Sequence, residues 1–237
     1  MNLRGRRLLI TAGPTRAAID AVRCIVPRGT GRLGALVAEE VLRRGASVTY
    51  VYGPSSAMPA LRGVARRRLV LIAVDTVEDL MRVFREELPK MYDAVVHSMA
   101  VLDFAPAETR PGKLSSAHEQ WVLRLVPTPK AIEIVKELAP QTFLVGFKLE
   151  VAKSPQELAA IALEALRRNR CDLVVANDQR EIDAGRHTGY FIDPLGSVVA
   201  VAQGKVAIAR ALVQLLADSL ERPVRGDPLT GRFSPRS

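Results

Sequence analysis

The segment from Gly29 to Gly34 holds the residues with the clearest chemical meaning in this 237-residue chain. It reads Gly-Thr-Gly-Arg-Leu-Gly, the spacing of a dinucleotide-binding loop. In such a loop the glycines directly follow the first strand, whereas seventeen residues separate Thr11 from Gly29 here. The second predicted strand ends Val51-Tyr52-Gly53, without the acid that would hold a ribose hydroxyl. This context argues against NAD.

The glycine loop favours a phosphate group as its ligand instead. Glycines let a backbone approach closely, and Gly31 and Gly34 open a predicted helix whose free N–H groups and dipole attract an anion. Nearby arginines add forked donors for phosphate or carboxylate oxygens: Arg16, Arg23, Arg28 and Arg32. The alternative interpretation of these arginines is an ordinary solvated basic loop.

Further polar residues follow other predicted strands. They are Gly13-Pro14-Thr15 after the first strand, Asp103 after the fourth, Lys148 after the sixth and Asn177-Asp178 after the seventh. Because ligands of open α/β sheets gather at the carboxyl ends of the strands, we expect these residues to share one edge. His97 lies within a strand pattern, which is more typical of a core histidine than of a catalytic base.

The elements that must position these residues alternate along the chain. Hydrophobic period and turn residues predict strands at 8–11, 48–51, 69–73, 94–100, 121–125, 143–147, 171–176, 190–192 and 198–201, and helices at 33–41, 77–88, 130–138, 155–168 and 205–220. This order predicts an α/β fold, a single domain with a mostly parallel, Rossmann-like sheet and a small antiparallel hairpin. We expect the domain to span residues 1–220 and the basic segment 221–237 to be a disordered tail.

Composition narrows the class of protein. The formal charge is +9, but aromatic residues are only 5% of the chain and are not interleaved with the basic ones, which argues against a nucleic-acid binder. No apolar run approaches the roughly 20 residues that span a bilayer, so we expect a soluble, cytoplasmic protein without membrane contact. Cys24 and Cys171 form no metal-ligand cluster and are expected to be reduced thiols in or near the core.

Several segments together resemble the phosphopantothenate-cysteine ligases, also called phosphopantothenoylcysteine synthetases. They are residues 9–16, 19–23, 30–34, 97–104, 112–116, 127–132, 144–148 and 176–178, and they span about residues 7–215 in the order of the family. Ser-Met-Ala-Val-Leu-Asp-Phe and Gly-Lys-Leu-Ser-Ser look most like the stand-alone bacterial enzymes. We therefore expect a protein without a flavoprotein half, and no FMN.

The resemblance implies a nucleotide-dependent ligation of 4'-phosphopantothenate with L-cysteine in coenzyme A biosynthesis. CTP, with ATP or UTP left open, would be attacked at its α-phosphate to give an acyl-nucleotide and pyrophosphate, and cysteine would then displace the nucleotide. Mg²⁺ would accompany the nucleotide, with no dedicated metal site on the protein. The resemblance also implies a homodimer.

The family's functional residues match positions of this sequence. Lys113 matches a loop lysine on the nucleotide phosphates, and Arg23 matches an arginine serving the pantothenate carboxylate. Asn177 matches an asparagine that reaches phosphopantothenate across a dimer interface. The remaining predicted nucleotide-site residues are Gly13, Thr15, Gly31, Gly34, Met99, Ala100, Asp103, Pro129, Lys130, Ala131, Ile132, Phe147 and Arg168.

One position departs from the family pattern. Pro27 stands where the family usually carries an asparagine associated with converting the acyl-nucleotide to product, and proline offers neither a side-chain donor nor an N–H. Either Arg28 or Thr30 compensates, or the second half-reaction is altered. Two other interpretations stay open: an NAD(P)-linked oxidoreductase, and a non-catalytic nucleotide- or phosphopantothenate-binding regulator derived from the ligase.

Overall fold

The computed structural model describes residues 2–61, 63–115 and 120–221. Its main sheet has eight strands in the order β12-β11-β10-β9-β6-β1-β4-β5. The strands are β1 (Arg7–Ala12), β4 (Ser47–Tyr52), β5 (Leu69–Ala73), β6 (Ala94–His97), β9 (Phe143–Glu150), β10 (Leu173–Asp178), β11 (Thr188–Ile192) and β12 (Val198–Gln203). The α-helices are α1 (Arg32–Arg43), α2 (Val77–Glu87), α3 (Val135–Leu138), α4 (Pro155–Asn169), α5 (Gln179–Asp183) and α6 (Lys205–Glu221).

Strand direction places one carboxyl edge across most of the sheet. β5, β4, β1, β6, β9 and β10 pair in parallel, and only β11 and β12 add antiparallel pairs. Because β11 reverses the direction of β10 and β12 reverses it again, β12 also ends at the carboxyl edge. The predicted α/β class, with a mostly parallel sheet and a hairpin extension, is confirmed.

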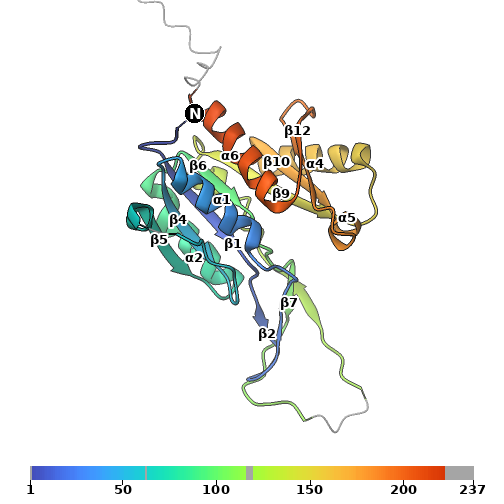
Figure 1. Cartoon of the computed structure of the whole chain (residues 1–237). Coiled ribbons are helices and arrows are strands. Elements are labelled where there is room, and N and C mark those ends of the chain that lie inside the picture. Colours follow the sequence, from blue (N-terminus) through green and yellow to red (C-terminus); the bar gives the residue numbers. More distant parts are fainter. Residues whose placement is uncertain (1, 62, 116–119, 222–237) are drawn as a thin grey trace, which may run out of the picture.

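Helices cover both faces of the sheet (Figure 1). On one face, α1 and α6 lie side by side and bury a cluster that includes Leu8, Ile10 and Val175. On the other, α2 and α4 bury a second cluster that includes Leu9, Val95 and Val174. Adjacent residues of β1 therefore point to opposite cores, as the two-residue period of a strand requires. No helix among the described residues combines the length and apolar character needed to cross a bilayer.

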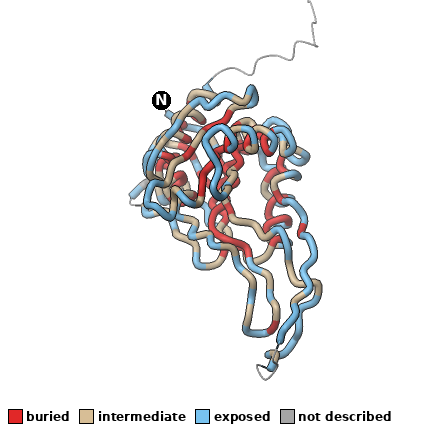
Figure 2. Tube along the Cα trace, turned by 90° about the vertical axis from the view of Figure 1, so that its right-hand side faces the viewer, coloured by how far each residue is buried: buried red, intermediate tan, exposed pale blue. Residues whose placement is uncertain are grey.

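An arm projects from the carboxyl edge of the sheet (Figures 1 and 2). It consists of the pairs β2 (Ala17–Ala18) with β3 (Cys24–Ile25) and β7 (Phe104–Pro106) with β8 (Leu125–Pro127), and the described residues between the strands of each pair. Buried segments concentrate in the body, and the arm is largely exposed or half-buried (Figure 2). Its exposed large apolar side chains are Val22, Val26, Phe104, Trp121, Val122, Leu125 and Val126.

Several predicted elements differ from the structure. The strand predicted at 121–125 is wrong as part of the main sheet, because β8 spans Leu125–Pro127 and pairs only with β7 in the arm. The helix predicted at 130–138 is shorter in the structure: only α3 (Val135–Leu138) is helical, because residues 131–134 form a turn. Cys171 is buried as expected, but Cys24 is exposed on the arm. α6 ends at Glu221, and residues 222–237 lie outside the described residues.

Candidate functional site

The loops that follow β1 and β6 are joined at the carboxyl edge. The Ala100 N–H donates to Gly13 O at 2.8 Å, and the Thr15 N–H donates to Ala100 O at 3.1 Å. Thr15 is fully buried, and its Oγ1 accepts the Leu102 N–H at 3.0 Å. Met99 is also buried, at 7% exposure. The structure thus brings together Gly13, Thr15, Met99 and Ala100, four of the predicted site residues.

The glycine loop folds against these two strand ends. A Cβ on Gly34 would lie 2.6 Å from Ala12 Cβ and 2.7 Å from Ser98 Oγ, so only glycine lets α1 begin this close to the strands. Gly31 is the N-cap residue, with φ of +67°, and no side chain caps the helix. The Arg32 N–H lies a long 3.4 Å from Thr30 Oγ1. The first N–H groups of α1 are therefore available to an anion.

A second strip of predicted residues lies beside β6 and β9. The Asp103 carboxylate pairs with the Lys130 ammonium, and the Thr128 N–H donates to Asp103 O at 3.0 Å. Asp103 and Lys130 have exposed side chains, whereas Ala131 is buried, and Ile132 packs against the core on the α2 side. The segment from Pro129 to Ile132 is thereby fixed next to Asp103.

Phe147 and Asn177 come from the neighbouring strands β9 and β10. Phe147 is half-buried and packs against the core under α1 and α6. Asn177 is buried, and its Nδ2 donates to Thr188 O at 2.6 Å, which holds the start of β11. Lys148 lies within β9 and pairs with Glu150 at 2.9 Å, so its ammonium is already engaged. Phe147 packs as a core residue would, and Asn177 donates to the Thr188 backbone of the same chain.

Arg23 and Lys113 lie together on the arm. Arg23 Nη1 approaches Asp20 Oδ2 at 3.2 Å and donates to Leu114 O at 3.4 Å, beside Lys113, while its guanidinium lies 5.3 Å from the Trp121 ring centroid. The Leu114 N–H in turn donates to Asp20 Oδ2 at 3.1 Å. Hydrogen bonds from backbone N–H groups, first that of Val22, lower the pKa of the Asp20 carboxyl despite its burial. Arg23, in the turn between β2 and β3, thus lies against Leu114, which directly follows Lys113 in the segment between β7 and β8.

Arg168 does not join the other predicted residues. It lies exposed in the last turn of α4, which starts at the carboxyl edge and runs back toward the start of β10. A helix of this length spans about 20 Å, so Arg168 lies at the opposite edge of the sheet. The structure of one chain therefore does not bring Arg168 together with the other predicted residues, and its role in the nucleotide site stays a prediction.

The hollow around Pro27 contains the residues expected to compensate for it. This hollow has a volume of about 380 Å³, and Arg16, Arg28 and Thr30 line it with Pro27. Arg16 Nε pairs with Asp75 at 2.6 Å. Arg28 and Thr30 therefore share a surface with the proline.

His97 and the end of β4 bear on the alternative functions. His97 is buried, lies 2.8 Å from Thr11 Oγ1, and has a pKa lowered to about 4 by burial. The prediction of a core histidine is confirmed.

β4 ends at Tyr52, and the chain continues Gly-Pro-Ser-Ser, so no carboxylate lies where a dinucleotide site would hold the ribose.

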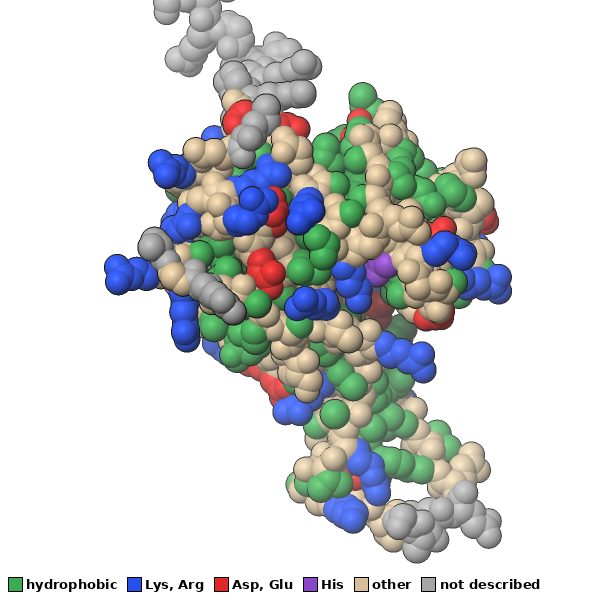
Figure 3. Space-filling model, in the orientation of Figure 1, with side chains coloured by type: hydrophobic (Ala, Val, Ile, Leu, Met, Phe, Trp, Pro, Cys, Tyr) green, Lys and Arg blue, Asp and Glu red, His purple; other side chains and the backbone are tan. Residues whose placement is uncertain are grey.

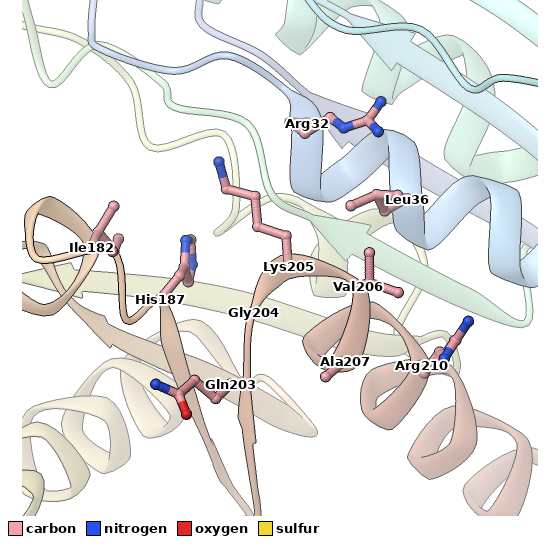
Figure 4. Close-up of a pocket in the computed structure, with 11 residues that line it drawn as sticks. Arg32, Leu36, Ile182, His187, Gln203, Gly204, Lys205, Val206, Ala207 and Arg210 are labelled. Atoms are coloured by element: carbon pink, nitrogen blue, oxygen red, sulfur yellow. The ribbon is translucent and has the colours of Figure 1, made fainter.

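Sequence reasoning missed a larger hollow on the same edge. It lies between the starts of α1 and α6 (Figure 4), has a volume of about 770 Å³, and is lined by Arg32, His187 and Lys205 among others. A signal was present in the sequence, because Gly204 directly precedes the predicted helix and Lys205 begins it. What the sequence could not show is that this helix starts beside α1.

Comparison with known proteins places the chain in a family. Residues 3–220 match the family described as DNA/pantothenate metabolism flavoprotein C-terminal domain. The chain is 42% identical over 177 residues to the coenzyme A biosynthesis bifunctional protein CoaBC of Thermococcus kodakarensis. That match covers 74% of this chain and 42% of the relative, so the chain spans less than half of that protein.

Two solved structures agree in fold. The DNA/pantothenate metabolism flavoprotein from Streptococcus pneumoniae is 30% identical with a TM-score of 0.81, covering 91% of this chain and 100% of that one. The C-terminal domain of a coenzyme A biosynthesis bifunctional protein CoaBC is 26% identical with a TM-score of 0.73, covering 92% and 97%. The resemblance drawn from the sequence motifs is confirmed, and the chain belongs to the family of DNA/pantothenate metabolism flavoprotein C-terminal domains.

Proposed function

We propose that the protein is a phosphopantothenate-cysteine ligase that activates 4'-phosphopantothenate with a nucleoside triphosphate and transfers the acyl group to L-cysteine. The observation that carries the proposal is the uncapped start of α1, seated by Gly34 against the ends of β1 and β6. Family membership and the role of the Thermococcus relative in coenzyme A biosynthesis support the same pathway for this chain.

The chemistry explains why such a site suits this reaction. A carboxylate is a poor acyl donor, so one of its oxygens first attacks the α-phosphorus and pyrophosphate leaves. The cysteine amine then attacks the carbonyl carbon, the C–O bond to the nucleotide breaks, and the nucleoside monophosphate departs. Negative charge develops on phosphoryl oxygens in the first step, where backbone N–H donors and cations stabilise it. The N–H groups of α1 at Leu33 and Gly34 are suitably placed donors.

Mg²⁺ would arrive with the nucleotide. Bound to the phosphates, it would neutralise their charge and orient them. Among the described residues no group of three or more His, Cys, Asp or Glu could form a metal cage. A magnesium ion that takes most of its ligands from phosphates and water needs few protein carboxylates, and the exposed Asp103 carboxylate at this edge fits that demand.

The nucleotide base has a candidate pocket in the segment from Pro129 to Ile132. Asp103 and Thr128 fix its beginning, and the buried Ala131 fixes its middle. A backbone held in this way can offer N–H and C=O groups to the edge of a base. We assign CTP as the nucleotide on the family resemblance, with ATP and UTP as competitors to be measured.

The arm supports the proposal of a homodimer. Seven large apolar side chains of the arm are exposed: Val22, Val26, Phe104, Trp121, Val122, Leu125 and Val126. Figure 3 shows hydrophobic side chains along the visible side of the arm. An apolar patch on a projecting element is typical of a protein–protein interface. In a dimer whose arms meet, Arg23 and Lys113 would be delivered to a substrate held at the edge of a sheet.

The half-reactions give the most informative test. Pyrophosphate and CMP are measured separately, with phosphopantothenate and CTP present, before and after cysteine is added. We expect pyrophosphate without cysteine, and CMP release only after cysteine. Pro27→Asn should speed the cysteine-dependent step if the loop tolerates losing the fixed φ of proline.

The outcomes separate the competing functions. Absence of pyrophosphate with CTP, ATP and UTP alike would defeat the ligase assignment, and binding without turnover would favour a regulator. Rapid amide formation by the parent protein would show that Pro27 is harmless and that Arg28 or Thr30 has taken over the role of the asparagine.

Lys113→Ala tests the arm. A lysine that meets developing charge contributes about 2 to 4 kcal/mol to the transition state, whereas loss of an exposed loop lysine shifts stability by about 0.5 kcal/mol or less. Turnover should therefore fall far more than stability. Arg85→Ala, which removes an exposed cation from the last turn of α2, is the matched control and should keep parental turnover. Parental turnover in Lys113→Ala would remove this lysine from the site.

A further inference from the structure

The two outer strands of the main sheet, β5 and β12, differ in how open their edges are (Figure 1). β12 is irregular at its start, because its register with β11 shifts between Phe191 and Ile192. A bulge of this kind is one of the features that stop an edge strand from pairing with another chain. β5 lacks such protection, since it pairs with β4 in continuous register from Leu69 to Ala73 and contains neither a charged residue nor a proline.

The backbone of β5 presents hydrogen-bonding groups at this edge. The Val74 N–H, directly after the strand, donates to Tyr52 O of β4 at 2.9 Å. Successive residues of a strand point their N–H and C=O groups to opposite sides, so the groups of Leu69, Leu71 and Ala73 point away from β4. Within the described part of the chain, no strand pairs with β5 on that side. The outward groups are therefore free to bond to a further strand.

The side chains of β5 are unusually exposed for an apolar strand. Val70 is 57% exposed and Leu71 is 48% exposed, and the two point to opposite faces of the sheet. Ile72 is half-buried and packs against the core under α2. Exposed apolar side chains beside open backbone groups are typical of an edge that pairs with another strand.

The charges at the two ends of β5 are of opposite sign. Arg66 and Arg67 lie exposed just before the strand, and Glu78 lies exposed in the first turn of α2 just after it. None of these three forms a salt bridge with another described residue. Arg68, by contrast, donates to Leu42 O of α1 at 3.0 Å. An edge that is basic at one end and acidic at the other is complementary to a reversed copy of itself.

We propose that β5 pairs with β5 of a second copy of this chain, in antiparallel orientation about a two-fold axis at Leu71. The outward groups then meet in register. Leu71 exchanges N–H···O=C bonds with Leu71 of the second copy, and Leu69 exchanges them with Ala73. The two main sheets become one continuous sheet across the interface.

The same axis also matches the side chains and the charges. Val70 lies opposite Ile72 of the second copy, and such pairs of β-branched residues stabilise neighbouring strands. Arg67 of each copy lies near Glu78 of the other, so opposite charges meet at both ends of the interface. A parallel arrangement would instead place arginines beside arginines, which excludes it.

This contact is separate from the arm, which projects from the carboxyl edge (Figure 1). If the arms pair as proposed above, each chain has two different two-fold contacts, and dimers join into larger assemblies. The mass in solution should then rise above that of two chains as the protein concentration increases.

Charge reversal tests the antiparallel arrangement. In Arg67→Glu and in Glu78→Arg, like charges meet at both ends of the interface. The dissociation constant of the contact, measured by sedimentation equilibrium, should therefore rise about 10-fold or more in each variant. An equimolar mixture of the two variants should associate again, because a mixed pair has opposite charges at both ends. Such recovery cannot come from a variant that fails to fold.

Leu71→Lys tests the position of the axis. It places two ammonium groups next to each other at the centre of the interface, so the contact should be lost. The largest species should fall to two chains if the arms pair, and to one chain if they do not. Val201→Lys is the matched control, because Val201 is a 57% exposed valine on the opposite edge strand, β12. This variant should keep the parental assembly.

Three outcomes would overturn the proposal. The first is equal assembly in the parent, in Leu71→Lys and in both charge variants. The second is loss of assembly in Val201→Lys alone, which would assign the contact to β12. The third is dissociation of both charge variants without recovery in their mixture. None of these measurements uses turnover, so this proposal and the proposed ligase function can fail independently.

Discussion

The helices on the two faces of the sheet begin in opposite ways at the same edge. α2 and α4 start from Thr76 and Ser154, whose hydroxyls accept N–H groups of the first turn while Asp79 and Glu157 return the bond. α1 and α6 start from Gly31 and Gly204, which carry no capping side chain. A capping residue contributes about 0.5 to 2 kcal/mol to stability. The face with α1 and α6 forgoes that stabilisation.

The difference teaches where to look for ligands in this fold. On the α2 and α4 face, a hydroxyl of the protein accepts one first-turn N–H group of each helix, so we expect these helix starts to contribute mainly to stability. On the α1 and α6 face the N–H groups stay open, and unpaired cations surround them. We therefore propose that stability and binding are divided between the two faces, and substitutions on each face should have different effects.

The largest effect is expected from Gly34→Ala. The added Cβ clashes with Ala12 and Ser98, so α1 must move away from the strand ends. We expect stability to fall by about 1 to 3 kcal/mol and turnover to fall by about 100-fold or more, since the N–H donors are displaced. Urea unfolding and steady-state kinetics measure the two effects.

A matched control for that substitution lies on the other face. Ala160→Gly, at an exposed position of α4, should cost about 1 kcal/mol of stability and leave turnover unchanged. If Gly34→Ala kept parental turnover, or if Ala160→Gly lost activity in proportion to stability, the division between the faces would be refuted.

The next effect concerns stability alone and depends on His97, which packs edge-on against Phe84 of α2 with ring centroids 5.6 Å apart. Burial lowers its pKa from 6.5 to about 4. Between these pH values the unfolded chain binds a proton that the folded chain does not. Stability should therefore be complete above about pH 6.5 and fall by up to about 3 kcal/mol as the pH drops to 4.

His97→Gln should flatten that part of the pH profile of the unfolding free energy. His187, whose pKa is also lowered, adds to the same slope and will remain in the variant. An unchanged slope in His97→Gln would show that the buried imidazole is not responsible, and that other groups set the acid stability of the fold.

The capping residues should give effects of about 1 kcal/mol. Thr76→Ala and Ser154→Ala each remove one side of a capping box, so each should lower the free energy of unfolding by about that amount. Turnover should stay within about twofold, because neither hydroxyl is among the predicted site residues. A large loss of turnover with little change in stability would place a ligand on this face and break the comparison.

The smallest effect is expected from removing residues 222–237. The end of α6 is already held within the described chain, because Arg6 Nη2 donates to Leu220 O at 2.6 Å. We expect the free energy of unfolding, and the activation free energy calculated from turnover, each to change by less than about 0.5 kcal/mol. Loss of dimerisation in the truncated protein, measured by light scattering, would assign the segment a structural role.

Much of the body of the fold follows from local sequence patterns. The apolar runs of β1 and β10 and the period of α2 and α6 predict these elements correctly, because core contacts set both the pattern and the structure. The prediction at 121–125 was wrong because an exposed arm uses the same apolar residues as a buried strand. The helix predicted at 130–138 is mostly a turn, which its apolar pattern did not show.

The site was predictable only in part for a related reason. Gly13 and Thr15 could be proposed because a glycine ends the first predicted strand, and Gly34 because glycines open the first predicted helix. The hollow at the start of α6 is lined by both Arg32 and Lys205, which lie far apart in the sequence. No local sequence pattern indicates that the helices carrying them are neighbours. Arg168 illustrates the converse, because a residue chosen from a motif lies in the last turn of α4, away from the other predicted residues.

The central claim, that the carboxyl edge activates a carboxylate through a nucleotide, is tested most directly by following one oxygen atom. Phosphopantothenate labelled with ¹⁸O in its carboxylate is incubated with CTP, Mg²⁺ and cysteine, and the products are analysed by mass spectrometry. If the acyl-nucleotide forms at the edge near α1, one ¹⁸O must appear in the phosphate of CMP and none in pyrophosphate. Label in inorganic phosphate, or product formed without transfer of label to CMP, would contradict the account.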